Sequence, residues 1–200
     1  EHVVRGLREK KLPLLVLDPV CLAEVLRDIQ TIADRLEVSE RGRRVVGDIR
    51  EALQSIVAQR QRGGGDEGAR AMGQDSSPAI LIQWWPKPVI SPGRLSWVQD
   101  LLGIAGATNP LGKEEIRSRP ISDEEVAEME PEAIVISWCG VSPSKYRPDV
   151  VRRNPLWRGI PAVRDAQIHC IPEAFLGRPG PRLVEGARAL SRIVGKLRGG

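Results

Sequence analysis

The strongest structural signal of the chain is the stretch Glu130-Pro131-Glu132-Ala133-Ile134-Val135-Ile136-Ser137-Trp138-Cys139-Gly140. Its proline and acids end any preceding helix, and a continuous, mostly β-branched apolar run follows. A run without polar alternation predicts a strand buried on both faces, as in a parallel sheet that helices cover. Ligands of open α/β sheets lie beyond the carboxyl ends of the strands. Trp138 is therefore either a ligand contact or a cap on the sheet.

The same kind of pattern continues on both sides of this stretch. Strand-like apolar runs occupy residues 79–85 and 167–171, helical spacing occupies residues 95–105 and 182–197, and loops are expected at 89–94 and 107–119. Ser122 and Glu125 have the spacing of a capping box, which predicts a helix start there. Strands that alternate with helices predict an α/β fold. We expect a three-layer α/β/α lobe with a mostly parallel sheet.

The chain before this lobe is largely helical. Apolar spacing predicts amphipathic helices over residues 20–37 and 39–62. The second would be about 36 Å long, which suits a strut between two lobes; an ordinary packing helix is the alternative. Residues 12–17 predict a short strand after a helix in 1–11, and one strand cannot bury both faces alone. We therefore expect partner strands from a further part of a sheet. Residues 63–78 are Gly-rich and polar, which predicts a linker.

Composition narrows the functional classes. The chain has 200 residues, enough for one domain or one and a half, and its 41% of hydrophobic residues supports a real core. The net charge of +4 comes from scattered arginines without a dense basic block, so no nucleic-acid partner is expected. The two histidines and three cysteines have no metal-ligand spacing. The sequence does not decide whether Cys139 and Cys170 form a disulfide.

Side chains at the predicted strand ends suggest binding rather than catalysis. No nucleophile–base–orienter pattern and no phosphate-binding glycine loop follows a strand, so we do not expect an enzyme. Aromatic and arginine side chains gather there instead, and together they suit a large, flat, partly anionic ligand. The candidate ligand contacts are Trp84, Trp85, Arg94, Trp138, Tyr146, Arg147 and Phe175. Core packing is the more common role of any single tryptophan, and we assign it to Trp97.

An ordered series of motifs resembles the second lobe of periplasmic binding proteins that serve metal-chelate ABC importers. The motifs are Trp84-Trp85-Pro86-Lys87-Pro88, Pro92-Gly93-Arg94, Trp97 to Gly106 with Asn109, Pro131 to Gly140, Asn154-Pro155-Leu156-Trp157, Ile160-Pro161-Ala162-Val163 and Pro179 to Gly186. The resemblance extends over residues 1–198 and is greatest to the cobalamin-binding type, while siderophore and haem binders share the fold.

The resemblance implies two α/β lobes joined by a long helix, with the ligand in the cleft between them. It divides the chain into a remnant of the first lobe (1–18), a helical segment with the inter-lobe helix (19–62), a linker (63–78) and a second lobe (79–200). It implies cobalamin or a related corrinoid as ligand, a ferric siderophore or haem as alternatives, and no intrinsic cofactor. It also implies a membrane permease as partner and a location in the periplasm or anchored at the cell surface.

The resemblance also implies a docking carboxylate on each lobe, which meets arginines of the permease. It is expected near Gly177, where this sequence has no acid, and Glu173 is the substitute that we predict. Two other functions are kept as alternatives. One is an interaction module that no longer binds a small molecule, and the other is an enzyme that uses Cys139.

Overall fold

The computed structural model describes residues 2–11, 13–63 and 77–199. The predicted linker at 63–78 therefore lies largely outside the described residues. The helices before it are α1 (His2–Glu9), α2 (Leu22–Arg35) and α3 (Ser39–Gly63), close to the predicted ranges. None of the described helices is both long and apolar enough to cross a bilayer.

A parallel sheet forms the centre of residues 77–199, as predicted. Its strands are β1 (Ile80–Gln83), β5 (Ala133–Ile136) and β6 (Ile168–Cys170), in the order β1-β5-β6. Ile82 pairs with Val135, which in turn pairs with His169. All four side chains of β5 are fully buried, because helices cover both faces of the sheet.

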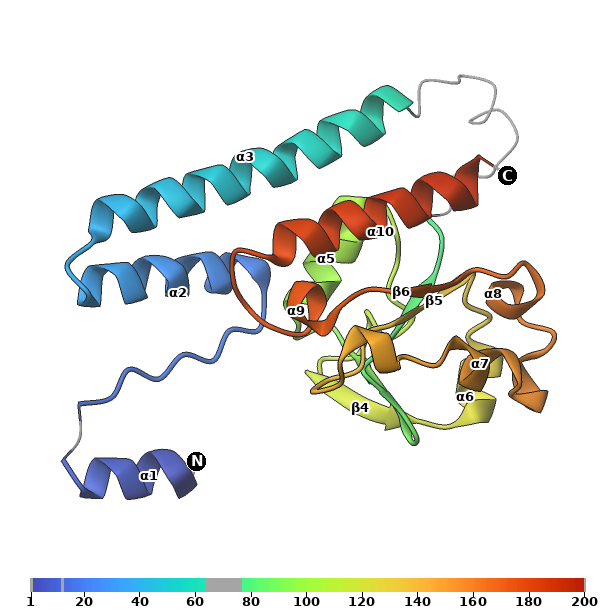
Figure 1. The fold of residues 1–200 in the computed structure, drawn as a ribbon, viewed down its shortest axis with the longest axis horizontal. Coiled ribbons are helices and arrows are strands. Elements are labelled where there is room, and N and C mark those ends of the chain that lie inside the picture. Colours follow the sequence, from blue (N-terminus) through green and yellow to red (C-terminus); the bar gives the residue numbers. More distant parts are fainter. Residues whose placement is uncertain (1, 12, 64–76, 200) are drawn as a thin grey trace.

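The two faces of this sheet belong to two separate cores. Ile82 and Val135 pack with α2, α3, α5 (Trp97–Ala105) and α10 (Leu183–Arg198). Leu81 and Ile134, one residue away in each strand, pack on the other face with α6 (Asp123–Glu128), α7 (Pro148–Arg152), η2 (Pro155–Trp157) and α8 (Pro161–Arg164). Figure 1 shows α5 and α10 on one side of β5 and β6, and α6 and α7 on the other. The alternation along each strand therefore gives the predicted α/β/α layers.

A second sheet was not predicted. Strands β2 (Trp85–Pro86), β3 (Val89–Pro92) and β4 (Ser118–Ile121) pair antiparallel in the order β2-β3-β4. The expected loops at 89–94 and 107–119 are thus wrong where β3 and β4 run. The three strands are short and contain prolines, which are usually a sign against a central strand. Two of the prolines lie on the outer strands β2 and β4, where a missing N–H donor is tolerated.

The predicted strand at 12–17 is also wrong. Residues 13–19 have no regular secondary structure, and Leu12 lies outside the described residues. No strand of the described part pairs with this segment, and a strand needs a partner for its backbone hydrogen bonds. Figure 1 shows α1 at the far end of the segment, apart from the layered body. The segment rejoins the body at Asp18, whose carboxylate lies 2.7 Å from Arg117 Nη2.

The long helix α3 is attached to the layered lobe along one face. Its buried side chains Val46, Ile49, Leu53 and Ile56 belong to the same core as α5 and α10. Near its end, Arg60 Nη1 donates to the carbonyl oxygens of Gly103 (2.9 Å) and Ile104 (3.4 Å). These carbonyls lie in the last turn of α5, where backbone acceptors lack helical partners. Arg60 thus caps α5 from another helix.

Candidate functional site

The carboxyl ends of the parallel strands bring several predicted site residues into one region. Beyond the ladder, Ser137 N–H donates to Gln83 O at 2.9 Å and Cys139 N–H donates to Trp84 O at 3.0 Å. The chain after β5 therefore continues beside the chain after β1. Buried side-chain atoms without a hydrogen-bond partner among the described residues include Gln83 Nε2, Trp84 Nε1 and Ser137 Oγ. Such atoms are rare in native proteins and call for an explanation; here they adjoin the strand ends.

Trp138 and Tyr146 form a buried aromatic pair at the carboxyl end of β5. Their exposed fractions are 6% and 5%, and their ring centroids lie 5.6 Å apart at a tilt of 59°. Trp138 Nε1 donates to Gln83 Oε1 at 3.0 Å, and Tyr146 Oη donates to Trp138 O at 3.4 Å. Burial raises the pKa of the Tyr146 hydroxyl. In this arrangement the pair supports the strand-end loops, and direct ligand contact by either ring stays a prediction.

Other predicted contacts are more accessible. Trp85 is 40% exposed on β2, and Trp84 and Phe175 are half-buried against the core that contains α5 and α10. Arg147, directly after the buried Tyr146, is exposed and has no ion pair with any described acid. Arg94 is exposed as well, but its guanidinium lies 2.9 Å from Glu115. Aromatic surface and the guanidinium of Arg147 are thus available near the strand ends.

Glu173 connects the loops after β5 and β6. Its carboxylate accepts hydrogen bonds from Gly140 N–H (3.1 Å) and from Arg178 Nε and Nη2 (3.3 and 3.2 Å). Burial raises the pKa of Glu173, but these hydrogen bonds outweigh burial and hold it below its ordinary value. A Cβ at Gly177 would lie 2.8 Å from Glu173 Cγ. The Glu173 side chain therefore occupies the space beside Gly177, where the resemblance implies an acid.

The thiols near this region are unpaired. Cys139 and Cys170 are both free and exposed, so the described structure contains no bridge between them. Partial burial raises the pKa of each thiol, and the Glu173 carboxylate raises the pKa of Cys139 further. A raised pKa lowers the thiolate fraction at neutral pH, which is unfavourable for a nucleophile. Within the described ranges, no group of three or more His, Cys, Asp or Glu side chains could hold a metal ion.

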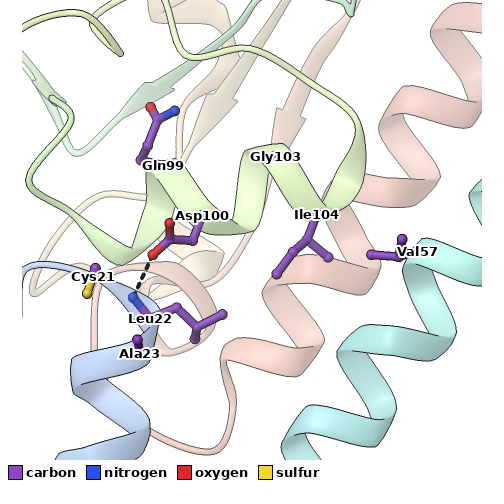
Figure 2. Close-up of a pocket in the computed structure, with 8 residues that line it drawn as sticks. All are labelled: Cys21, Leu22, Ala23, Val57, Gln99, Asp100, Gly103 and Ile104. Carbon is purple, nitrogen blue, oxygen red and sulfur yellow. Dashed lines mark hydrogen bonds between the residues drawn. The ribbon is translucent and has the colours of Figure 1, made fainter.

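A surface hollow lies elsewhere, between α2, α3 and α5. Its volume is about 610 Å³, and its lining includes Leu22, Val57, Asp100 and Ile104. Figure 2 shows Asp100 reaching the start of α2, where its Oδ2 accepts a hydrogen bond from Leu22 N–H at 2.6 Å. This acid acts as a helix cap from a neighbouring element. None of the described residues that line the hollow is aromatic or cationic, and none is a ligand contact predicted from the sequence.

Comparisons with known proteins place the chain among binding proteins. A model of the periplasmic binding protein family matches residues 6–174. Over 182 residues the chain is 21% identical to an uncharacterized ABC transporter substrate-binding lipoprotein of Bacillus subtilis (strain 168), covering 90% of this chain and 53% of the relative. Over 179 residues it is 24% identical to a vitamin B12-binding protein of Pectobacterium carotovorum, covering 90% and 58%.

The fold agrees with this assignment. The periplasmic heme-binding protein from Roseiflexus sp. RS-1 superimposes with a TM-score of 0.76 at 21% identity, covering 97% of this chain and 71% of that one. The chain spans between half and three fifths of the length of the two sequence relatives. The family model covers most of the chain and the layered α/β architecture is shared, so this chain belongs to the periplasmic binding protein family.

Proposed function

We propose that the chain is part of the substrate-binding component of an ABC importer, and that it captures a metal chelate at the carboxyl end of its central sheet. The observation that carries this proposal is the set of accessible aromatic and cationic side chains at that edge: Trp84, Trp85, Phe175 and Arg147. Open α/β sheets bind ligands at this edge. Family membership supports the proposal, because a named relative is an ABC transporter substrate-binding lipoprotein.

A corrinoid such as cobalamin is the ligand that we favour. The vitamin B12-binding relative supports this choice. The heme-binding structure supports haem as an alternative, and a ferric siderophore is the third chelate class. All three have extended surfaces and polar or anionic edges, which match aromatic faces and a guanidinium group.

Capture requires no bond to be made or broken. Trp85 would cover an apolar face of the ligand, and the free guanidinium of Arg147 would meet an amide or carboxylate at its edge. Arg94 would contribute after exchanging its Glu115 partner for the ligand. Trp138 and Tyr146 would fix the loop below. Binding alone accounts for these roles, so we propose no catalytic residue.

We also propose the division of the chain into 1–18, 19–62, 63–78 and 79–200, with the first segment belonging to another α/β lobe. Exposed apolar side chains support this division. On the segment after α1, Leu15 and Val16 are 44% and 51% exposed, and at the end of α2 Leu36 is 67% exposed. Packing against a further lobe would remove this surface from water. Helix α3 would then be the inter-lobe strut.

We propose that Glu173 docks onto a membrane permease. The protein would reach the permease either free in the periplasm or anchored at the cell surface. The position of its side chain beside Gly177 supports this role. The carboxylate is bound to Arg178, and its side chain is only 15% exposed. Arg178 is 63% exposed, so its guanidinium is free to turn into water and leave Glu173 to a permease arginine.

An interaction module without a small-molecule ligand is the second candidate. The exposed Leu15, Val16 and Leu36 favour it, because the same apolar surface fits a partner protein as well as a second lobe. A stable dimer in solution that buries this surface would support it.

Calorimetric titration of the chain with cobalamin, haem and a ferric siderophore tests the first candidate. We expect one-to-one binding of a single chelate, weakened about tenfold or more, or about 1.4 kcal/mol, by Trp85→Ala. Leu36→Ala removes exposed apolar surface from the end of α2 and is the matched control. An unchanged affinity in a Trp85→Ala, Arg147→Ala double variant would reject the site. No heat with any ligand would favour the interaction module.

A further inference from the structure

Glu173, in the loop after β6, makes two direct hydrogen bonds to the loop after β5. The carboxylate of Glu173 accepts from Gly140 N–H at 3.1 Å, and its backbone N–H donates to Tyr146 Oη at 3.1 Å. Tyr146 Oη in turn donates to Trp138 O at 3.4 Å. Glu173 is thus bonded directly to Gly140 and Tyr146, and is linked to Trp138 through the Tyr146 hydroxyl.

The first half of the segment that Glu173 holds, around Gly140, has little backbone hydrogen bonding of its own. Gly140 has a φ of 70° and open space where a side chain would be, and its residue is exposed. The η1 turn (Pro143–Lys145) is closed by Lys145 N–H to Ser142 O at 2.8 Å and Tyr146 N–H to Pro143 O at 3.1 Å. Before that turn, Val141 N–H reaches Trp138 O at 3.4 Å, and Gly140 N–H has no backbone acceptor among the described residues. The Gly140 amide therefore depends on the Glu173 carboxylate for its partner.

Arg178 and Gly177 give this carboxylate its direction. Two nitrogens of Arg178 donate to both oxygens of Glu173, as a guanidinium fork does with a carboxylate. Gly177 N–H donates to Glu173 O at 2.7 Å, and the missing side chain at Gly177 leaves room for Glu173 Cγ. The short helix α9 (Glu173–Leu176) and the residues after it thus form one local unit around Glu173.

We infer that Glu173 is a positioning residue of the ligand site, oriented by Arg178, and that it fixes the segment 138–146 on which Trp138, Tyr146 and Arg147 depend. The inference rests on the proposed function for its ligand, but not for its effect on the loop. A ligand that meets Arg147 would then find a loop already in place, which reduces the ordering that binding must supply.

The loop is tested without ligand by measuring exchange of the Gly140 amide proton by NMR. We expect at least tenfold faster exchange in Glu173→Ala and a smaller increase in Arg178→Met. Arg178→Lys keeps the positive charge, so exchange of the Gly140 amide proton should stay as slow as in the wild type. Glu185 and Arg188 form an exposed ion pair on α10 at 2.7 Å, so Glu185→Ala and Arg188→Met are the matched controls and should leave Gly140 unchanged. Unchanged exchange in Glu173→Ala would overturn the inference.

Titration of the same variants with cobalamin, haem and a ferric siderophore tests the effect on binding. Glu173→Ala and Arg178→Met should weaken binding of the chelate that the wild-type chain accepts by about tenfold, and Arg178→Lys should recover it. If Glu173→Ala exchanges its Gly140 amide proton faster but binds the chelate with wild-type affinity, Glu173 has no role in the ligand site. A wild-type chain that binds none of the chelates would remove the proposed function, while the exchange measurement would still decide whether Glu173 positions the loop.

Discussion

Trp138 and Gln83 are joined in the interior by a hydrogen bond of 3.0 Å from the indole Nε1 to Oε1, across the ends of two neighbouring strands. Gln83 is fully buried and Trp138 is 6% exposed. The bond joins residues that are 55 positions apart in the sequence, and it fixes the indole of Trp138 beside the end of β1. Its strength therefore bears on both stability and the shape of the site.

Replacing Gln83 by Leu should destabilise the fold by about 1–3 kcal/mol, because the buried indole N–H loses its acceptor. Urea unfolding measures the difference. Gln54→Leu, at an exposed position of α3, is the control and should have little effect. Equal stability of the two variants would mean that the indole finds another acceptor.

Two glycines of α10 should respond in opposite directions to alanine. A Cβ at Gly186 would lie 2.2 Å from Phe175 O, whereas a Cβ at Gly195 would meet nothing within 4 Å. Gly186→Ala should cost about 1–3 kcal/mol because the helix and the loop must separate. Gly195→Ala should stabilise by about 0.5–1 kcal/mol, since alanine favours a helix. Thermal unfolding of the two variants decides this, and a neutral Gly186→Ala would contradict the close packing.

The cap that Arg60 gives to α5 predicts a smaller effect. Arg60→Met keeps most of the aliphatic stem but removes the donors to Gly103 O and Ile104 O. A cation at a helix C-terminus contributes about 0.3–1 kcal/mol, and a loss of that size is expected in urea unfolding. The exposed Arg50 of the same helix gives the control, Arg50→Met, which should have a smaller effect. Addition of salt should reduce the difference.

Low pH should reduce the free energy of unfolding by protonating the carboxylates that pair with Arg119. Its guanidinium binds both oxygens of Glu114 at 2.8 and 2.9 Å and also lies 2.8 Å from Glu125. The hydrogen bonds from Arg119 lower the pKa of Glu114; the Ser122 backbone N–H, followed by Arg119, lowers that of Glu125. A lowered folded-state pKa contributes stability above the unfolded pKa, and this is lost as pH falls through the folded value.

The stability difference between wild type and Arg119→Met should thus be full at pH 7 and shrink below about pH 4, the ordinary carboxyl range. Urea midpoints at several pH values measure it. Arg43 pairs with Glu40 on the exposed side of α3, and Arg43→Met should show a much smaller difference. A difference for Arg119→Met that persists at pH 2 would indicate lost packing of the side chain in place of lost charge.

The parallel sheet was predictable because its strands are continuous apolar runs, and the capping box at Ser122 was predicted and is present. The antiparallel sheet was not, because β3 and β4 are defined by pairing with each other and not by their own composition. The segment 13–17 shows the converse: its apolar residues suit a strand, but no partner strand lies beside it among the described residues.

For the site, the sequence indicated which residues follow the strands, but not which of them packing would cover. Trp84 is the first residue after β1 and Trp138 is the second after β5. The first is half-buried against one core, and the second is enclosed in the other. The bond between Glu173 and Gly140 joins residues of two different strand-end loops. Such contacts form only in the assembled sheet, so no local sequence pattern predicts them.

The attachment of Asp18 to Arg117 and of Leu22 to Asp100 has a mechanical consequence. From Asp18 to the start of α2 the chain is held to the layered body at these two points. Residues 13–17 form no hydrogen bond or ion pair with a described residue of that body. Lengthening the chain within 13–17 should therefore change the position of α1 and leave the sheet undisturbed.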